Sequence, residues 1–208
     1  IKKLGLINDN ISKKVRSQYE ENPYPRWSHF IKSNQPKYEA IKVINSDINP
    51  NTYSTYVESY PLKILIAGCG TGKQIMGAQI YKNAQITAID LSLSSLSYAQ
   101  RKINELGIDN VELIQMDLLE VSLLNDKFDI IECGGVLHHM HDPLKGLKAL
   151  VSILHKNGFL KLGLYSEIAR KDIIEARNYI ASKKFQPSED KIRNFRKKII
   201  SGELSDLN

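Results

Sequence analysis

The stretch ILIAGCGTGK, residues 64–73, decides the fold. It begins as a short apolar run with the size and composition of a β-strand that is buried on both faces. It then passes through three alternate glycines, Gly68, Gly70 and Gly72, and leads directly into a helical pattern. Glycine permits a tight turn and lets a ligand lie against the backbone where a Cβ atom would clash. The stretch therefore predicts a buried strand, a ligand-contacting turn and a helix.

Two familiar glycine-rich motifs do not fit this turn. The dinucleotide fingerprint G-x-G-x-x-G requires a glycine three residues after Gly70, but that residue is Lys73. A phosphate-binding P-loop requires Lys followed by Ser or Thr, whereas Lys73 is followed by Gln74. A tight strand-to-helix turn without any ligand remains open as an alternative.

Similar apolar runs recur along the chain and alternate with helical patterns. The strand-like runs are residues 62–67, 84–90, 111–117, 128–133 and 158–165, and the amphipathic helical stretches are residues 92–106 and 143–155. Asp142 and Pro143 suit the N-cap and first position of the second helix. Short links between alternating strands and helices predict an α/β fold, a Rossmann-like, doubly wound, mainly parallel sheet. A further helical region is expected over residues 166–200.

The part of the chain before residue 60 has a different character, because most of the prolines lie there. We expect a helix over residues 11–22 with Ser12 as its N-cap, and a second over residues 37–44. Residues 1–60 are therefore predicted to form an N-terminal helical cap. Residues 61–208 are predicted to form the main domain together with the C-terminal helices.

Composition narrows the class of protein. The chain has 208 residues, of which 42% are hydrophobic and 25% charged, so it can bury one sizeable core and is neither disordered nor a disulfide scaffold. Cys69 and Cys133 lie in apolar segments, which favours a reducing cytoplasm. No export signal or apolar stretch of ~18 residues is present, so no membrane association is expected. The start at Ile1 and the polar end at Asn208 lead us to expect a fragment of a longer protein.

The chain is basic, with a net charge of +6 and a pI near 9.1. The basic residues concentrate late in the sequence, at Lys183, Lys184, Lys191, Arg193, Arg196, Lys197 and Lys198. Such a run is typical of a solvated helix face, and RNA binding is the alternative.

Carboxylates end two of the predicted strands. In a doubly wound sheet the ligand binds at the carboxyl ends of the strands, near the switch in strand order. Asp90, eighteen positions after Gly72, can accept both hydroxyls of a ribose, and Asp117 can accept from an exocyclic amine such as that of adenine. Helix capping is the alternative for each carboxylate, although Ser92 can itself cap the helix that follows Asp90.

The order and spacing of four motifs resemble the class I S-adenosylmethionine-dependent methyltransferases. The motifs are GCGTG at 68–72, AIDLS at 88–92, QMD at 115–117 and FDIIECGGVLHHMHDP at 128–143, and the resemblance covers roughly residues 19–180. It implies an enzyme that uses S-adenosylmethionine as cofactor, forms S-adenosylhomocysteine and transfers the methyl group by in-line displacement.

The resemblance also implies which residues hold the cofactor. The glycine turn would pack against the methionine and ribose, Asp90 would hold the ribose, Asp117 would face the adenine, and residues 133–136 would lie beside the reactive methyl. The implied cofactor-binding residues are Ala67, Gly68, Cys69, Gly70, Gly72, Asp90, Leu91, Met116, Asp117, Leu118, Cys133 and Gly134. We interpret Cys133 as a small buried residue rather than as a nucleophile.

Two further groups are candidates for the site. Tyr24, Arg26 and Trp27 lie among prolines and are predicted to form a lid, in which Arg26 pairs with the methionine carboxylate; packing is the alternative for Trp27. His138 and His139 are the nearest candidates for a general base, with His139 preferred, and a structural role is the alternative for each. No metal is expected, although His141 and Asp142 follow them in sequence.

A narrower resemblance rests on YEENPYPRW, residues 19–27, and LGLYSEIARKDI, residues 162–173. These segments are similar to a bacterial branch of methyltransferases that is often joined to tetratricopeptide repeats, which implies a fused or associated repeat domain. Such relatives continue through further sheet, and nothing after Ile200 can supply a final hairpin. We therefore expect the substrate-recognition part to be truncated at the C-terminus.

The methyl acceptor is not identified by the sequence. A protein or small-molecule acceptor is favoured over RNA, because the basic residues gather in one helix and do not interleave with stacking aromatic residues. Two alternatives stay open. The chain could be a catalytically silent module that binds the cofactor or a partner, or an RNA methyltransferase that uses the basic C-terminal helix.

Overall fold

The computed structural model describes residues 1–29, 36–56, 60–185 and 188–204. The chain divides into two compact units, Ile1–Leu164 and Tyr165–Asn208. The described part of residues 1–60, predicted to be a helical cap, belongs to the first unit. Residues 165–208, which we expected to share a domain with residues 61–164, form a unit of their own.

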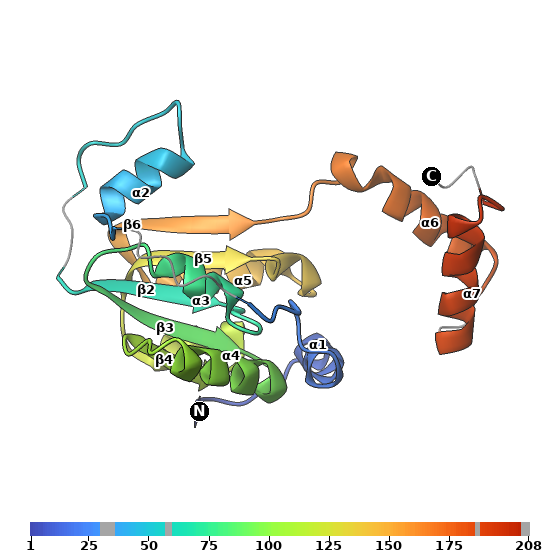
Figure 1. Ribbon diagram of the computed structural model, residues 1–208, viewed down its shortest axis with the longest axis horizontal. Helices are drawn as coiled ribbons and strands as arrows, with labels where there is room; N and C mark the ends of the chain where they lie inside the picture. Colours follow the sequence, from blue (N-terminus) through green and yellow to red (C-terminus); the bar gives the residue numbers. More distant parts are fainter. Residues whose placement is uncertain (30–35, 57–59, 186–187, 205–208) are drawn as a thin grey trace. The chain divides into compact units, whose positions relative to one another are not determined.

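The first unit is built on a six-stranded sheet in which every pairing is parallel (Figure 1). The strand order is β1-β4-β3-β2-β5-β6. The strands are β1 (Lys2–Lys3), β2 (Leu62–Ala67), β3 (Ala84–Asp90), β4 (Val111–Gln115), β5 (Phe128–Gly134) and β6 (Leu154–Gly163). The chain runs outward from β2 to β4 and then returns to the other side of β2 with β5. The switch in strand order therefore lies between β2 and β5.

Helices connect the strands and cover both faces of the sheet. They are α1 (Asn10–Glu21), α2 (Ala40–Asp47), α3 (Lys73–Ala78), α4 (Leu93–Glu105) and α5 (Pro143–Ser152), with the short 3-10 helices η1 (Leu118–Leu124) and η2 (Leu137–His139). Ser92 caps α4 and Asp142 caps α5, as the sequence predicts. The predicted α/β, doubly wound, parallel architecture is thus confirmed.

Two hydrophobic clusters form the core, one on each face of the sheet. Side chains alternate along β2, so that Ile64 and Ile66 pack into the cluster that includes α2, α3 and α4. Leu65 and Ala67 pack into the opposite cluster with η1 and α5. Every one of these β2 side chains is fully buried, which fixes the strand in the centre of the sheet and positions the glycine turn at its end.

Two local predictions are wrong, and one strand was not predicted. The helix α1 begins at Asn10, and its N-cap is Asp9 rather than Ser12, because the Asp9 carboxylate accepts from the N–H groups of Ile11 and Ser12. The strand β1 was not predicted, since two lysines carry no strand signal. The strand β6 was predicted to be buried on both faces, but it pairs only with β5 in the described part of the chain and is half exposed.

The second unit consists of η3 (Ile168–Arg170), α6 (Lys171–Ser182) and α7 (Glu189–Ile200). Its helices contain no buried residue in the described part, and Tyr179 of α6 stacks on Phe195 of α7 with ring centroids 6.0 Å apart. Across the described parts of both units, no helix is both long enough and apolar enough to cross a membrane.

Candidate functional site

The glycine turn lies at the carboxyl end of β2, beside the switch in strand order. Gly68, Gly70 and Gly72 have φ angles of +77°, +52° and +90°, a region that other residues rarely adopt. The space that a Cβ atom would need is filled by Val136 at Gly68 and by the carbonyl oxygen of Tyr24 at Gly70. At these two positions the chain itself, rather than a ligand, occupies the space that glycine leaves.

Backbone hydrogen bonds join this turn to the end of β3. The N–H groups of Gly68 and Cys69 both donate to the carbonyl of Ile89, at 2.8 and 3.0 Å. Gly72 then forms the N-cap of α3. These hydrogen bonds hold the ends of β2 and β3 together. We call the residues at the carboxyl ends of β2, β3, β4 and β5 the rim.

The Asp90 carboxylate also links the residues that follow β2 to those that follow β3. One oxygen accepts from Gly70 N–H and the other from Ser92 N–H, both at 2.8 Å. Burial raises the pKa of Asp90, although the hydrogen bonds from Ser92 and Gly70 oppose that effect. Helix capping was the structural alternative for Asp90, but Ser92 caps α4 and the Asp90 carboxylate instead joins Ser92 to the glycine turn. Each oxygen retains capacity for a further hydrogen bond, because a carboxylate oxygen can accept more than one.

Asp117 occupies the corresponding place after β4. It is buried, and its side chain accepts from Leu119 N–H at 3.0 Å to cap η1. Capping, the alternative considered for this residue, is therefore observed. Met116 and Leu118 on either side are buried, and Gln115 donates from its side chain to the carbonyl of Leu91 at 3.0 Å.

The end of β5 is the last of the four strand ends that form the rim. Cys133 is fully buried, and this burial raises the pKa of its thiol to about 12, so the group is not poised as a nucleophile. Burial likewise raises the pKa of Cys69 well above its ordinary value. The carbonyl of Gly134 faces the side-chain amide of Gln74 at 3.5 Å. Ala67 is fully buried at the end of β2.

The structure thus brings together, at the carboxyl ends of four adjacent strands, the predicted cofactor-binding residues other than Arg26. Those residues are Ala67, Gly68, Cys69, Gly70, Gly72, Asp90, Leu91, Met116, Asp117, Leu118, Cys133 and Gly134.

A segment from the N-terminal part of the chain lies across the glycine turn. We call residues 19–28, which include the last turn of α1, the strap. Thr71 donates from its N–H to the carbonyl of Tyr24 at 3.2 Å and from its hydroxyl to the carbonyl of Pro25 at 2.6 Å. In return, Trp27 donates from Nε1 to the Thr71 hydroxyl at 3.1 Å.

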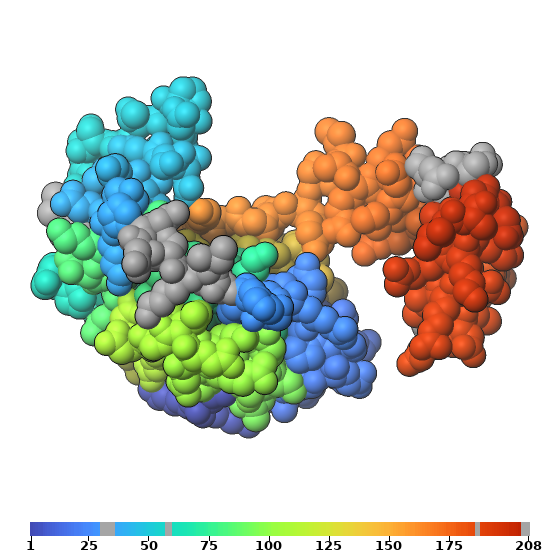
Figure 2. Space-filling model, viewed as in Figure 1, coloured from blue at the N-terminus to red at the C-terminus, as the bar shows by residue number. Residues whose placement is uncertain are grey.

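The strap is fixed to α4 at both of its ends. Near its start, Glu20 accepts from the N–H groups of Leu93 and Ser94, at 2.8 and 2.9 Å, and so caps the helix from outside. Near its end, Tyr98 donates its hydroxyl to the carbonyl of Trp27. The space-filling view shows α1 lying against α4 (Figure 2).

The predicted lid residues behave differently from one another. Trp27 is half buried and packs against the hydrophobic core, so the packing alternative is observed for it. Tyr24 is 65% exposed, and its backbone carbonyl accepts the hydrogen bond from Thr71 N–H. Arg26 is exposed and makes no hydrogen bond or ion pair within the residues that the structure describes. Its pairing with a carboxylate stays a prediction.

The two histidines follow β5 in η2. Their ring centroids lie 4.4 Å apart, and both residues are partly buried. His139 Nε2 lies 3.5 Å from the hydroxyl oxygen of Tyr19, on the strap. The structure therefore places His139 in polar contact with the strap.

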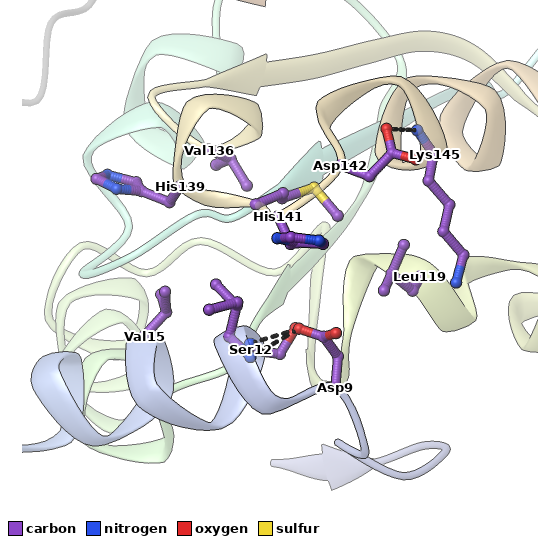
Figure 3. A pocket seen from close by; sticks show the side chains of 11 residues that line it. Asp9, Ser12, Val15, Leu119, Val136, His139, His141, Asp142 and Lys145 are labelled. Carbon is purple, nitrogen blue, oxygen red and sulfur yellow. Dashed lines mark hydrogen bonds between the residues drawn. The ribbon is translucent and has the colours of Figure 1, made fainter.

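A cavity of about 240 Å³ lies next to His139. Figure 3 shows α1 along one side and the loop that leads into α5 along the other. The walls are Asp9, Ile11, Ser12, Val15, Leu119, Val136, His139, Met140, His141, Asp142 and Lys145. Val136 also contacts Gly68, so the cavity adjoins the glycine turn. No group of three His, Cys, Asp or Glu residues in the described ranges is arranged to hold a metal ion.

Sequence reasoning missed the tasks of Tyr19, Glu20 and Thr71. Tyr19 and Glu20 belong to the stretch YEENPYPRW, which the sequence singles out, but their partners lie about 70 or more residues away in the chain. Only the fold brings such partners together. Asp9 carried a local signal, because aspartate directly before a helical pattern is a preferred N-cap.

Comparison with known proteins gives a consistent result. Residues 64–158 match the sequence profile of the family described as "Methyltransferase domain". The ubiquinone biosynthesis O-methyltransferase of Histophilus somni is 32% identical over 102 residues, which are 47% of this chain and 42% of that enzyme. An uncharacterized protein of Synechococcus sp. is 42% identical over 121 residues, 57% of this chain and 29% of that protein.

A solved structure is similar as well. PKMT2 from Rickettsia typhi in complex with AdoHcy (S-adenosylhomocysteine) aligns with a TM-score of 0.55 and 27% identity, over 71% of this chain and 30% of PKMT2. The matched segments span less than half the length of each of these three proteins.

Replacement of Gly70 tests the fit between the turn and the strap. Gly70→Ala should lower the free energy of unfolding by about 2 kcal/mol or more, because a side chain is strained at positive φ and the new Cβ meets the Tyr24 carbonyl. Gly135→Ala is the control, since Gly135 has a φ of +77° and no atom within 4 Å of its missing Cβ. Urea unfolding of both variants measures the difference; equal losses would show that the contact with Tyr24 contributes nothing.

Replacement of Glu20 tests how the strap is held. Burial of Glu20 opposes its ionisation, but hydrogen bonds from Ser94 and Leu93 outweigh it and hold the pKa of Glu20 below its ordinary value. The strap contact is therefore present above that ordinary value and is lost as pH falls through the lowered pKa. Glu20→Gln should destabilise the chain by about 1 kcal/mol, as loss of a helix cap does.

Trp27, the single tryptophan, reports the same change. Acrylamide quenching of its fluorescence should increase in Glu20→Gln and stay at the parent value in Glu21→Gln, the exposed neighbour. Equal quenching in both variants would contradict the role given to Glu20.

Proposed function

We propose that this chain, which belongs through residues 64–158 to the class I S-adenosylmethionine-dependent methyltransferase family, transfers a methyl group from S-adenosylmethionine to a protein or small-molecule acceptor. The observation that carries the proposal is the convergence of the glycine turn, Asp90 and Asp117 at adjacent carboxyl ends beside the switch in strand order. This is where ligands bind in sheets of this type.

The residues present suit the cofactor chemically. The two oxygens of Asp90 each hold one N–H group and can still accept from the two hydroxyls of a ribose. Asp117 holds Leu119 N–H through one oxygen, which leaves the other for an exocyclic amine. Beside Gly135, no atom of the described residues lies within 4 Å of the place that a Cβ atom would take, so this position offers space.

The chain's own part in catalysis is positioning and proton removal. S-adenosylmethionine, when bound, supplies an electrophilic methyl group. Asp90 and the turn orient the cofactor, and the strap excludes water from the rim. His139, with His138 beside it, is the group that takes a proton from an O–H or N–H acceptor, since imidazole is effective near neutral pH. Arg26 is available to pair with the methionine carboxylate.

A cytoplasmic location fits this proposal, because Cys69 and Cys133 are both free thiols. Association with a repeat domain stays a prediction. The preference for a protein or small-molecule acceptor is supported by α7, whose aromatic residue Phe195 stacks on Tyr179 and is not displayed among the basic side chains.

A thermal unfolding experiment with AdoHcy tests the cofactor site. At ~100 times its dissociation constant AdoHcy should add roughly 2.7 kcal/mol to the stability of the parent chain. Asp90→Ala should lose most of this gain, because the ribose acceptor is removed.

Asp129→Ala is the matched control. Asp129 is also buried and accepts from the N–H of Lys63 at 2.8 Å, but it lies at the amino end of β5, away from the site. This variant should lose stability yet keep the gain from AdoHcy. No gain in the folded parent, or an equal gain in Asp90→Ala, would contradict the proposal.

RNA as acceptor is the second candidate, favoured by the exposed basic residues Lys191, Arg193, Arg196, Lys197 and Lys198 of α7. It predicts binding to RNA that weakens steeply with salt. We expect instead that the label from radioactive S-adenosylmethionine enters the protein or small-molecule fraction of a bacterial extract. Labelled RNA, lost when the five basic residues are replaced by glutamine, would establish the second candidate.

A further inference from the structure

Tyr19 connects two strand ends that are not neighbours in the sheet. Its backbone carbonyl accepts from the Ser92 hydroxyl at 3.0 Å, directly after β3. Its side-chain hydroxyl lies 3.5 Å from His139 Nε2, beyond the end of β5. In the sheet, β2 lies between β3 and β5. Tyr19 therefore bridges the segments that follow β3 and β5, the two strands that flank β2.

The position of Tyr19 is well fixed. The adjacent residue Glu20 is held by two N–H groups of α4, so the backbone on both sides of the Tyr19 carbonyl is anchored. The rings of Tyr19 and His139 meet edge to face, with centroids 6.3 Å apart and an interplanar angle of 74°. His138 lies against the same imidazole. His139 is thus held between two rings, which limits the orientations that it can adopt.

The chemistry of the two groups sets the direction of their hydrogen bond. A phenol hydroxyl is a stronger acid than the N–H of a neutral imidazole, and an imidazole nitrogen is a stronger base than a phenol oxygen. The favoured arrangement is Tyr19 O–H donating to His139 Nε2, which places the imidazole proton on Nδ1. The distance of 3.5 Å is long, and such hydrogen bonds shorten when an active site fills.

We propose that Tyr19 is a catalytic residue that relays the acceptor's proton to His139. As the acceptor atom forms its bond to the methyl carbon, its proton passes to the Tyr19 oxygen and the Tyr19 proton passes to His139 Nε2. The carbon–sulfur bond breaks with its electron pair on sulfur, and the imidazole becomes an imidazolium. Tyr19 is neutral before and after the step. This inference rests on the proposed function and adds to it the group that contacts the acceptor.

The relay restricts the acceptor class. It serves only a nucleophile that carries a transferable proton, an O–H or N–H group, and is of no use to a thioether or a tertiary amine. The acceptor would reach Tyr19 and His139 from the adjoining cavity, whose walls include His139 and whose apolar side chains Ile11, Val15, Leu119, Val136 and Met140 suit an apolar stem.

The tautomer of His139 tests the hydrogen bond without any acceptor. Nitrogen-15 NMR of the imidazole should show neutral His139 protonated at Nδ1 in the parent chain. In Tyr19→Phe the proton should move to Nε2, the tautomer that free histidine side chains prefer. Tyr98→Phe is the control, because it removes another tyrosine hydroxyl that holds the strap but does not face His139. A parent ring protonated at Nε2, or a tautomer unchanged in Tyr19→Phe, would overturn the proposal.

The transfer rate tests the relay itself. The methyl acceptor in this assay is the fraction of the bacterial extract that the parent chain labels. Tyr19→Phe should slow methyl transfer to it about 100-fold, the usual contribution of proton transfer by a positioned side chain. Tyr98→Phe should be slowed much less. A loss below about threefold in Tyr19→Phe would also overturn the relay. Calorimetry of AdoHcy binding to the parent separates the two proposals. Absence of binding would refute the proposed function and the relay with it. If AdoHcy binds, the tautomer and the transfer rate decide the role of Tyr19.

Discussion

The Asp90 carboxylate is the contact on which the arrangement of the site depends. It holds the N–H groups of Gly70 and Ser92 at the same time, so the glycine turn after β2 and the N-cap residue of α4 share one acceptor. A buried carboxylate is tolerated only when such donors compensate its lost hydration. Because the same oxygens can accept further hydroxyls, we propose that the carboxylate that joins these two segments also binds the ribose.

The strap and the segment after β5 fill the space that the missing glycine side chains leave. The spaces left at Gly68 and Gly70 admit Val136 and the Tyr24 carbonyl, so segments from the N-terminal part and from beyond β5 close onto the turn. The strap is held to α4 by hydrogen bonds that involve backbone groups and by the packing of Trp27 against Tyr98 and the hydrophobic core. The strap therefore has a defined position over the glycine turn.

Much of the fold followed from the sequence because its signals are local. Alternating apolar runs and helical stripes gave the parallel, doubly wound sheet, and Ser92 and Asp142 marked helix starts correctly. Errors arose where a local signal was weak or shared. Lys2 and Lys3 form a strand only because β4 offers an edge, and Ser12 competed with Asp9 for the same cap.

The residues of the rim were also predictable, because strand ends gather at one edge of a parallel sheet. The contacts across the site were not. Tyr19 meets His139 and Glu20 meets Ser94 only through the path of the strap, which no spacing in the sequence encodes. Similarly, the hydrogen bonds that Asp90 accepts from Gly70 and Ser92 could not be predicted from its place at the end of β3.

The most direct test of the central claim is a titration of the chain, labelled with nitrogen-15 at glycine only, with AdoHcy. If the rim holds the cofactor, the amide signals of Gly68, Gly70, Gly72, Gly134 and Gly135 shift together. Those of Gly77 at the far end of α3, Gly107 after α4 and Gly158 near the amino end of β5 stay in place. Absence of any shift in the folded chain, or shifts confined to the latter three glycines, would contradict the account.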